Sequence, residues 1–351
     1  MNELTNKAWP TVRLLLIPYL AFLFLLFFPI EYEIDAPGGI TAVSQTIDID
    51  YNEDKVVEGS ISTTYIMAIA RPTWFMFLAG YYSPYTTITK MSSTNISYTN
   101  EELRQISYLD KETSVDASII VGYQAAALIN PEIVIGYVTK TLVFGKADYL
   151  SHYDEIAFGD EFVSVEGDDG EVATTIGGIA LVTVLLDAYD FTFLNEAGES
   201  YTVTLQKDAE TGKFGLTLKQ YHLVDRDVTF PLYQNLDSNI GGPSGGLLST
   251  LFVYNQLVTE DVTRGLKIAG TGTINYDGSA GYIGGVKQKI LTAYFAGVDV
   301  FFIPFLDEDY VYDNYVEALR VCEEVGIDPT GWLVGVSSFQ DVVDWLSAVE
   351  D

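Results

Sequence analysis

Two glycine-rich segments contain the residues best suited to nucleophilic chemistry. The first, 241–246, presents Ser244 after Pro243, and the second, 284–289, places Lys287 just after a glycine pair. A serine hydroxyl needs a base to become a nucleophile, and a lysine can serve when burial keeps its amine neutral. The two segments could therefore supply a serine nucleophile and a lysine base.

The serine segment has the features of a tight turn that ends in a helix. Glycines permit close backbone approach and positive φ, and Pro243 stiffens the turn. Leu247 and Leu251 follow at near-helical spacing, so Ser244 is expected at a helix N-terminus, where unpaired N–H groups stabilise an oxyanion. The alternative is that Ser244 is only a helix N-cap. The residues expected to support the turn and the oxyanion are Gly241, Gly242, Pro243 and Gly245.

The lysine segment offers two amines, of which Lys287 is the predicted base. It opens an apolar helix, so a dry surround that lowers its pKa is expected. Lowering an ordinary lysine pKa from about 10.4 to about 7 costs roughly 4 to 5 kcal/mol, which a packed pocket must supply. Lys289 would point to a different face of the helix. The alternative for Lys287 alone is a solvated surface lysine.

Composition argues against several other kinds of site. The 49 Asp and Glu against 18 Lys and Arg give a net charge of −31, which disfavours nucleic acid as a partner. Cys322 is the one cysteine, so no intramolecular disulfide is expected. His152 and His222 lack the spacing of a zinc site, and the sequence has no phosphate loop. No metal, no cofactor and no ATPase activity are therefore predicted.

An uncharged run dominated by Leu and Phe covers residues 14–30. As a helix it would extend about 25 Å towards a hydrocarbon core of about 30 Å, and Arg13 could snorkel to improve the fit. Lys7 and Arg13 precede the run and Glu31 follows it, so the positive-inside rule places the amino terminus in the cytoplasm and the rest outside. A single-pass signal anchor in the cell membrane is predicted over a cleaved signal peptide, because no Ala-x-Ala site follows.

The rest of the chain changes periodicity twice. The capping-box sequence from Thr99 to Glu102 predicts a helical tract, and a second helix is expected from Ala117 to Ile129. Short strands then predominate, and near the carboxyl terminus strands alternate with helices. The expected segments are a cytoplasmic tail (1–11), the transmembrane anchor (12–30), a first part of the extracellular peptidase region (36–130), a β-rich module (131–220) and a catalytic domain (221–351).

Four segments in order resemble the peptidase domain of Lon-type proteases. Gly242-Pro243-Ser244-Gly245-Gly246 is similar to the Lon-type Gly-Pro-Ser-Ala-Gly motif, with Gly245 in place of Ala, and 284–289 is similar to its lysine motif. Residues 267–274 and 277–281 resemble the strand and turn between them. The resemblance implies catalytic roles for Ser244 and Lys287 as a Ser-Lys dyad. It implies supporting roles for Thr271, Asp277, Gly284 and Gly285.

The β-rich module resembles a PDZ domain. Residues 158–167 are similar to the Leu-x-x-Gly-Asp-x-Ile-x-x-Val-x-Gly run of bacterial PDZ domains, and Ile135-Gly136-Tyr137 resembles their carboxylate-binding turn. The whole chain resembles the membrane-anchored, ATPase-free branch of Lon-type peptidases. This resemblance implies an α+β fold with one N-terminal transmembrane helix and a peptidase domain of α/β layers interrupted by a PDZ domain. It also implies a homo-oligomer, because Lon-type domains often form rings.

The combined prediction is an ATP-independent, membrane-anchored serine endopeptidase. It would cleave peptides or exposed protein segments outside the cytoplasm, with the PDZ segment docking the substrate. The first alternative is a noncatalytic membrane-bound PDZ adaptor with a peptidase-like shell, which the intact Ser244 and Lys287 disfavour. The second is an acidic surface-adhesion protein, which predicts partner binding without cleavage products.

Overall fold

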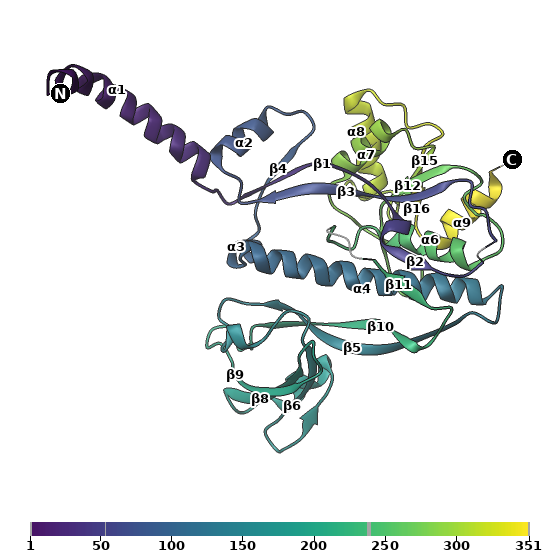
Figure 1. Ribbon diagram of the computed structural model, residues 1–351. Coiled ribbons are helices and arrows are strands. Elements are labelled where there is room, and N and C mark those ends of the chain that lie inside the picture. The colour runs from purple at the N-terminus through teal and green to yellow at the C-terminus, as the bar shows by residue number, and fades with distance from the viewer. Residues whose placement is uncertain (1, 53, 237–239, 350–351) are drawn as a thin grey trace.

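A six-stranded mixed sheet is the larger layer of the computed structural model, which describes residues 2–52, 54–236 and 240–349 (Figure 1). Its order is β16-β15-β12-β3-β1-β4. The first four strands of that order run parallel, and the last three pair antiparallel. The strands are β1 (Tyr32–Ala42), β3 (Ser60–Ala70), β4 (Thr87–Lys90), β12 (Lys267–Gly270), β15 (Val300–Pro304) and β16 (Leu333–Val336).

Helices cover both faces of this sheet because its central strands are apolar on both sides. Ile268 and Phe302 pack with α4, α6 and α9, whereas their neighbours Ala269 and Phe301 pack with α7 and α8. Successive side chains of a strand point to opposite faces, so each strand contributes to both cores. The helices are α4 (Asn100–Ala127), α6 (Gly246–Leu257), α7 (Val286–Ala296), α8 (Asn314–Val325) and α9 (Phe339–Ala348).

A second sheet lies on the other side of α4 (Figure 1) and has a core of its own, which includes Val165, Phe191 and Phe193. Its order is β10-β5-β6-β8-β9, with β7 paired to β6. We call residues 134–230 the β5–β10 module. Its elements are β5 (Val134–Lys146), β6 (Glu161–Glu166), β7 (Val172–Ala173), α5 (Ile176–Val182), β8 (Ala188–Leu194), β9 (Ser200–Gln206) and β10 (Leu216–Phe230).

Short elements connect these layers. The strand β2 pairs with β11 beneath α6, and β13 pairs with β14 ahead of α7. Two short helices, α2 and α3, flank β4. The bounds are β2 (Ile47–Ile49), α2 (Trp74–Tyr81), α3 (Ser93–Ser97), β11 (Tyr233–Asn235), β13 (Thr273–Ile274) and β14 (Ala280–Gly281).

The N-terminal helix α1 (Asn2–Phe27) projects from the body (Figure 1) but does not support the predicted membrane anchor. No helix in the described part of the chain is both long enough and apolar enough to cross a bilayer. The prediction of a single transmembrane helix at 12–30 is therefore wrong. The uncharged part of α1 runs only from Leu14 to Phe27, which covers roughly 21 Å of a hydrocarbon core of about 30 Å.

The α+β class agrees with the sequence prediction, and one helical boundary does not. Thr99 and Glu102 form the expected capping box. From there a single helix, α4, continues to Ala127, where the sequence predicted two helices. No proline or glycine interrupts residues 100–121, so nothing ends the helix between the two predicted segments.

Candidate active site

Ser244 lies in a tight turn that leads directly into α6. Gly242 has a φ of 88°, which glycine adopts without strain. Its N–H donates to the carbonyl of Ser107 on α4 at 2.9 Å. The hydroxyl of Ser114, two helical turns further along α4, donates to the carbonyl of Pro243 at 3.0 Å. The helix α4 therefore holds the serine turn at two points.

The end of β12 holds the same turn from the other side. Thr271 Oγ1 donates to the carbonyl of Ser244 at 3.1 Å, and the N–H of Gly272 donates to it at 2.8 Å. Thr271 is fully buried. The backbone of the serine is thus clamped between a helix and a strand from distant parts of the sequence, which fixes where its side chain can point.

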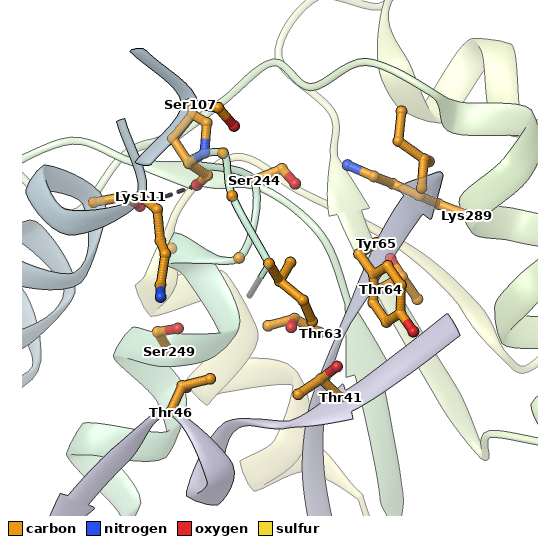
Figure 2. Close-up of a pocket in the computed structure, with 18 of the residues that line it drawn as sticks. Thr41, Thr46, Thr63, Thr64, Tyr65, Ser107, Lys111, Ser244, Ser249 and Lys289 are labelled. Atoms are coloured by element: carbon orange, nitrogen blue, oxygen red, sulfur yellow. Dashed lines mark hydrogen bonds between the residues drawn. The ribbon is translucent and has the colours of Figure 1, made fainter. Parts of the chain in front are cut away.

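The side chain of Lys289, near the start of α7, reaches the same threonine. Its side chain is 2% exposed, and its Nζ donates to Thr271 Oγ1 at 3.0 Å. Figure 2 shows the Ser244 hydroxyl and the Lys289 amine pointing toward each other. Thr271 therefore links the amine of the lysine to the backbone of the serine.

The spacing of buried residues explains why Lys289 faces inward. Val286, Ile290 and Ala293 are buried on α7, and Lys289 lies on their face because helical residues three and four apart share a face. Lys287 lies two positions before it, about 200° away around the helix. Lys287 is half-buried and does not line the pocket that contains Ser244.

Burial shifts the pKa values of two groups at this site towards neutral pH. It lowers the pKa of Lys289 to about 7, while the charge of Asp35 on β1 acts in the opposite direction. Burial also raises the pKa of Asp35 to about 6, with Glu33 adding to the rise and Lys289 opposing it. An ordinary lysine is neutral in only about one molecule in a thousand near pH 7.4. Lys289 is neutral in a large fraction of molecules at that pH.

The serine and the lysine share a pocket of about 610 Å³. Its walls are the serine turn, the second half of β3, one face of α4 and the start of α7. Among the described residues, no group of three or more His, Cys, Asp or Glu side chains is placed to hold a metal ion. The side chains that line the pocket offer a hydroxyl nucleophile and a basic amine, which is the minimum set for acyl transfer.

Comparison with known proteins finds a similarity in this part of the chain. Residues 231–322 are similar to the Lon protease (S16) C-terminal proteolytic domain. We call these residues the Lon-like segment. The similarity supports a serine peptidase.

Two relatives carry the same name. The chain is 40% identical over 72 residues to the Lon protease of Ureaplasma parvum, which covers 20% of this chain and 9% of that protein. It is 34% identical over 110 residues to the Lon protease of Malacoplasma penetrans, which covers 31% of this chain and 13% of that protein. The chain therefore matches only a small part of the length of either relative.

The Lon-like segment contains the predicted catalytic motifs, and the structure brings most of their residues together. Around the pocket lie Gly241, Gly242, Pro243, Ser244, Gly245 and Gly284. Thr271 lies behind them as the link to Lys289. Asp277 is exposed in the turn between β13 and β14, where it accepts hydrogen bonds from Ser279, and it does not line the pocket.

The residues expected to bind a peptide carboxylate lie outside the Lon-like segment. Ile135, Gly136 and Tyr137 belong to the strand β5 and pair with β10, so they do not form the turn that the sequence predicted. The N–H of Gly136 donates to Thr229 Oγ1 at 3.1 Å. A backbone donor that is already paired cannot also hold a ligand carboxylate without losing that bond.

The sequence prediction missed Lys289 and the wall of the pocket supplied by the first half of the chain. The spacing of Val286, Lys289, Ile290 and Ala293 was a usable signal for Lys289. For Ser107 and Ser114 on α4 no comparable signal exists, because their contacts with the serine turn bridge more than a hundred residues of sequence. Lys111, between them on the same helix, lines the pocket.

Proposed function

We propose that this protein is a serine endopeptidase in which Ser244 is the nucleophile and Lys289 is the general base. One observation carries the proposal: the buried amine of Lys289 is held by Thr271, which also holds the backbone of Ser244, beside an open pocket. Lowering the pKa of this amine to about 7 requires that its charged form be disfavoured by about 5 kcal/mol relative to its neutral form. Burial of Lys289 is the main cause of this shift. Lys287 is only half-buried.

The reaction follows the scheme of acyl transfer. As Ser244 Oγ attacks the scissile carbonyl carbon, Lys289 Nζ takes the hydroxyl proton. The tetrahedral intermediate collapses, the C–N bond breaks, and Lys289 returns the proton to the leaving amine. A water then gives a proton to Lys289 and attacks the acyl ester. The new carboxyl product leaves, and the proton returns to Ser244.

The N–H of Ser244 itself is the proposed oxyanion donor. Within the described part of the chain it donates to no acceptor, and it lies just ahead of the N-terminus of α6, where the helix dipole favours negative charge. The N–H of Gly242, which the sequence also suggested, is already paired with Ser107.

The open edge of β3 is the proposed support for an extended substrate. The ladder between β12 and β3 ends at Thr63, and the following residues of β3 line the pocket. The N–H of Ser60 faces the β12 side, so alternation directs the backbone groups of Thr64, Ile66 and Ala68 to the same side. A peptide paired there would lie beside Ser244.

Three variants test the dyad on an unstructured protein and on an internally quenched peptide. Ser244→Ala and Lys289→Met should each lower kcat/KM at least about a thousand-fold, because each removes a member of the reacting pair. Lys287→Met is the matched control and should retain activity. If Lys287→Met lost activity and Lys289→Met retained it, Lys287 would be the base. Equal turnover in all three variants would eliminate the dyad, and no cleavage by the unmodified protein would favour the noncatalytic adaptor.

The proposed hydrolysis does not consume a nucleotide, since side chains and water complete the proton transfers. We expect the same rate of peptide cleavage with and without ATP and Mg²⁺. A rate that depended on ATP would mean that a nucleotide-driven step limits turnover.

The β5–β10 module is the proposed docking site for substrate peptides. The module has a separate core. It is hydrogen-bonded to Glu102 on α4, the helix that holds the serine turn, and to Tyr98 just before that helix. Tyr98 Oη accepts from the N–H of Lys146, and Tyr153 Oη donates to Glu102 at 2.7 Å. Substrate held by the module would therefore lie at a fixed orientation to the pocket.

A deletion tests this docking role. Lys146 and Leu216 are partners across the β5–β10 ladder, so an Asn-Gly turn can join them in place of residues 147–215. We expect slower cleavage of long unstructured substrates and unchanged cleavage of short peptides. Equal loss on both substrates would indicate a folding role, and no loss on either would rule out docking.

A further inference from the structure

The described lining of the pocket differs in its ionisable side chains from the chain as a whole. The chain carries a net charge of −31. Among the described residues that line the pocket there is no Asp or Glu, and the ionisable amines are Lys111 and Lys289. Lys111 is on α4 and Lys289 is on α7, so the two amines come from different walls of the pocket.

The neighbours of Lys111 on α4 are hydrogen-bonded to the serine turn. Ser107, Lys111 and Ser114 lie four and three residues apart, so they share one face of the helix. Ser107 accepts from the N–H of Gly242, and Ser114 donates to Pro243. Because the residues on both sides of Lys111 contact the serine turn, Lys111 must also face it.

Figure 2 shows Ser244 between the two lysines, with the side chain of Lys111 extending toward Ser249 and Thr46. Both residues line the pocket, together with Thr41 and Thr63. An ammonium group beside several hydroxyl groups is a set of donors that suits a carboxylate. The amine that would serve as base lies on the other side of the nucleophile.

We propose that Lys111 selects substrates with a carboxylate next to the scissile bond. This inference rests on the proposed peptidase function and names a substrate class for that site. The carboxylate belongs either to an Asp or Glu side chain or to the carboxyl terminus of a short peptide. Its place matters for catalysis, because a negative charge beside Lys289 would favour the protonated amine and disable the base. Binding at Lys111 puts Ser244 between the two charges.

Matched peptides measure this selection. An internally quenched peptide, blocked at both ends, carries Glu, Gln or Leu at each position that flanks the scissile bond. We expect kcat/KM to be at least about tenfold higher for Glu than for Gln at one of these positions, as a hydrogen bond to a charged group implies. To test the carboxyl terminus as the source of the carboxylate, kcat/KM of a peptide with uncharged side chains and a free carboxyl terminus is compared with that of its carboxyl-terminal amide. Either preference should weaken as salt is added.

Variants of Lys111 decide whether this residue causes the preference. Lys111→Met should bring the Glu-to-Gln ratio close to one, Lys111→Arg should keep it well above one, and Lys111→Glu should bring it below one. A ratio near one in the unmodified protein, or one that Lys111→Met leaves unchanged, overturns the inference. If Ser244→Ala abolishes cleavage in the same assays, the peptidase function still stands. If Ser244→Ala cleaves normally, the peptidase function itself fails.

Discussion

Lys289 Nζ donates to Thr271 Oγ1 at 3.0 Å, and Thr271 Oγ1 donates its own proton to the carbonyl of Ser244. A threonine hydroxyl has one proton, so toward Lys289 it can only accept. A neutral amine that donates an N–H to Thr271 still has its lone pair to accept a proton from another partner. Since the Ser244 hydroxyl and this amine point toward each other (Figure 2), the lone pair is available for the serine proton.

Replacing Thr271 tests this arrangement. Thr271→Val removes the acceptor for Lys289 and a donor to Ser244, so we expect kcat to fall roughly ten- to a hundred-fold with little change in KM. Thr271→Ser keeps the hydroxyl and should retain most of the activity. Equal activity in the valine and serine variants would show that the hydroxyl does not position the base.

The dependence of cleavage on pH should follow the protonation of Lys289. Its pKa is lowered to about 7, and only the neutral amine can accept the proton of Ser244, so kcat/KM should rise with pH and level off above about 7. Asp35→Asn removes a negative charge that raises this pKa, and it should move the rise to lower pH. If Asp35→Asn left the pH profile unchanged, the charge of Asp35 would not influence the pKa of the base.

The stability of the protein should also depend on Lys289. The folded-state pKa lies below the ordinary 10.5, so the unfolded state binds more protons between about pH 7 and 10.5, and the free energy of unfolding rises with pH across that window. The buried lysine therefore destabilises the fold most below pH 7. We expect Lys289→Met to raise the free energy of unfolding at pH 7 by roughly 2 to 4 kcal/mol.

Urea denaturation at two pH values checks this expectation. The gain in stability from Lys289→Met should shrink between pH 7 and pH 10, whereas Lys287→Met should change stability little at either pH. A gain that stays constant with pH would mean that packing, rather than the protonation of the amine, accounts for it.

Gly285 supplies a further test, because the start of α7 depends on it. Its φ is 69°, and a Cβ there would lie 2.8 Å from Cγ2 of Ile66 on β3. Gly285→Ala should therefore cost about 1 to 3 kcal/mol in the free energy of unfolding and displace Lys289, with a loss of kcat. Gly284→Ala is the matched control, since a Cβ at Gly284 meets no atom within 4 Å. Similar effects of the two substitutions would contradict this role.

Local sequence signals predicted the regular elements well and the lysine poorly. The alternation of strands and helices predicted near the carboxyl terminus is observed as β15, α8, β16 and α9, because apolar periodicity marks these elements. The same periodicity places Lys289, rather than the predicted Lys287, on the buried face of α7. Ser244 lies just before the first turn of α6, at a helix N-terminus as the sequence predicted.

Other features of the site could not be predicted, because they depend on contacts between distant parts of the chain. Lys111 and Ser114 are polar residues on a long helix, and alone they are typical of a solvated surface. Likewise, Ile135 to Tyr137 have a turn-like glycine, yet pairing with β10 makes them part of a strand. Tertiary pairing overrides such local preferences.

The length of α4 has a consequence for how this protein can vary. Tyr98 and Glu102 fasten the module at one end of the helix, and Ser107, Ser114 and Ser118 fasten the serine turn further along. Each inserted residue would rotate one set of contacts against the other by about 100° and separate them by about 1.5 Å. Single-residue insertions between Glu102 and Ser107 should therefore break one of the two sets of contacts, and an insertion of about seven residues would restore the rotation but add about 10.5 Å to the separation.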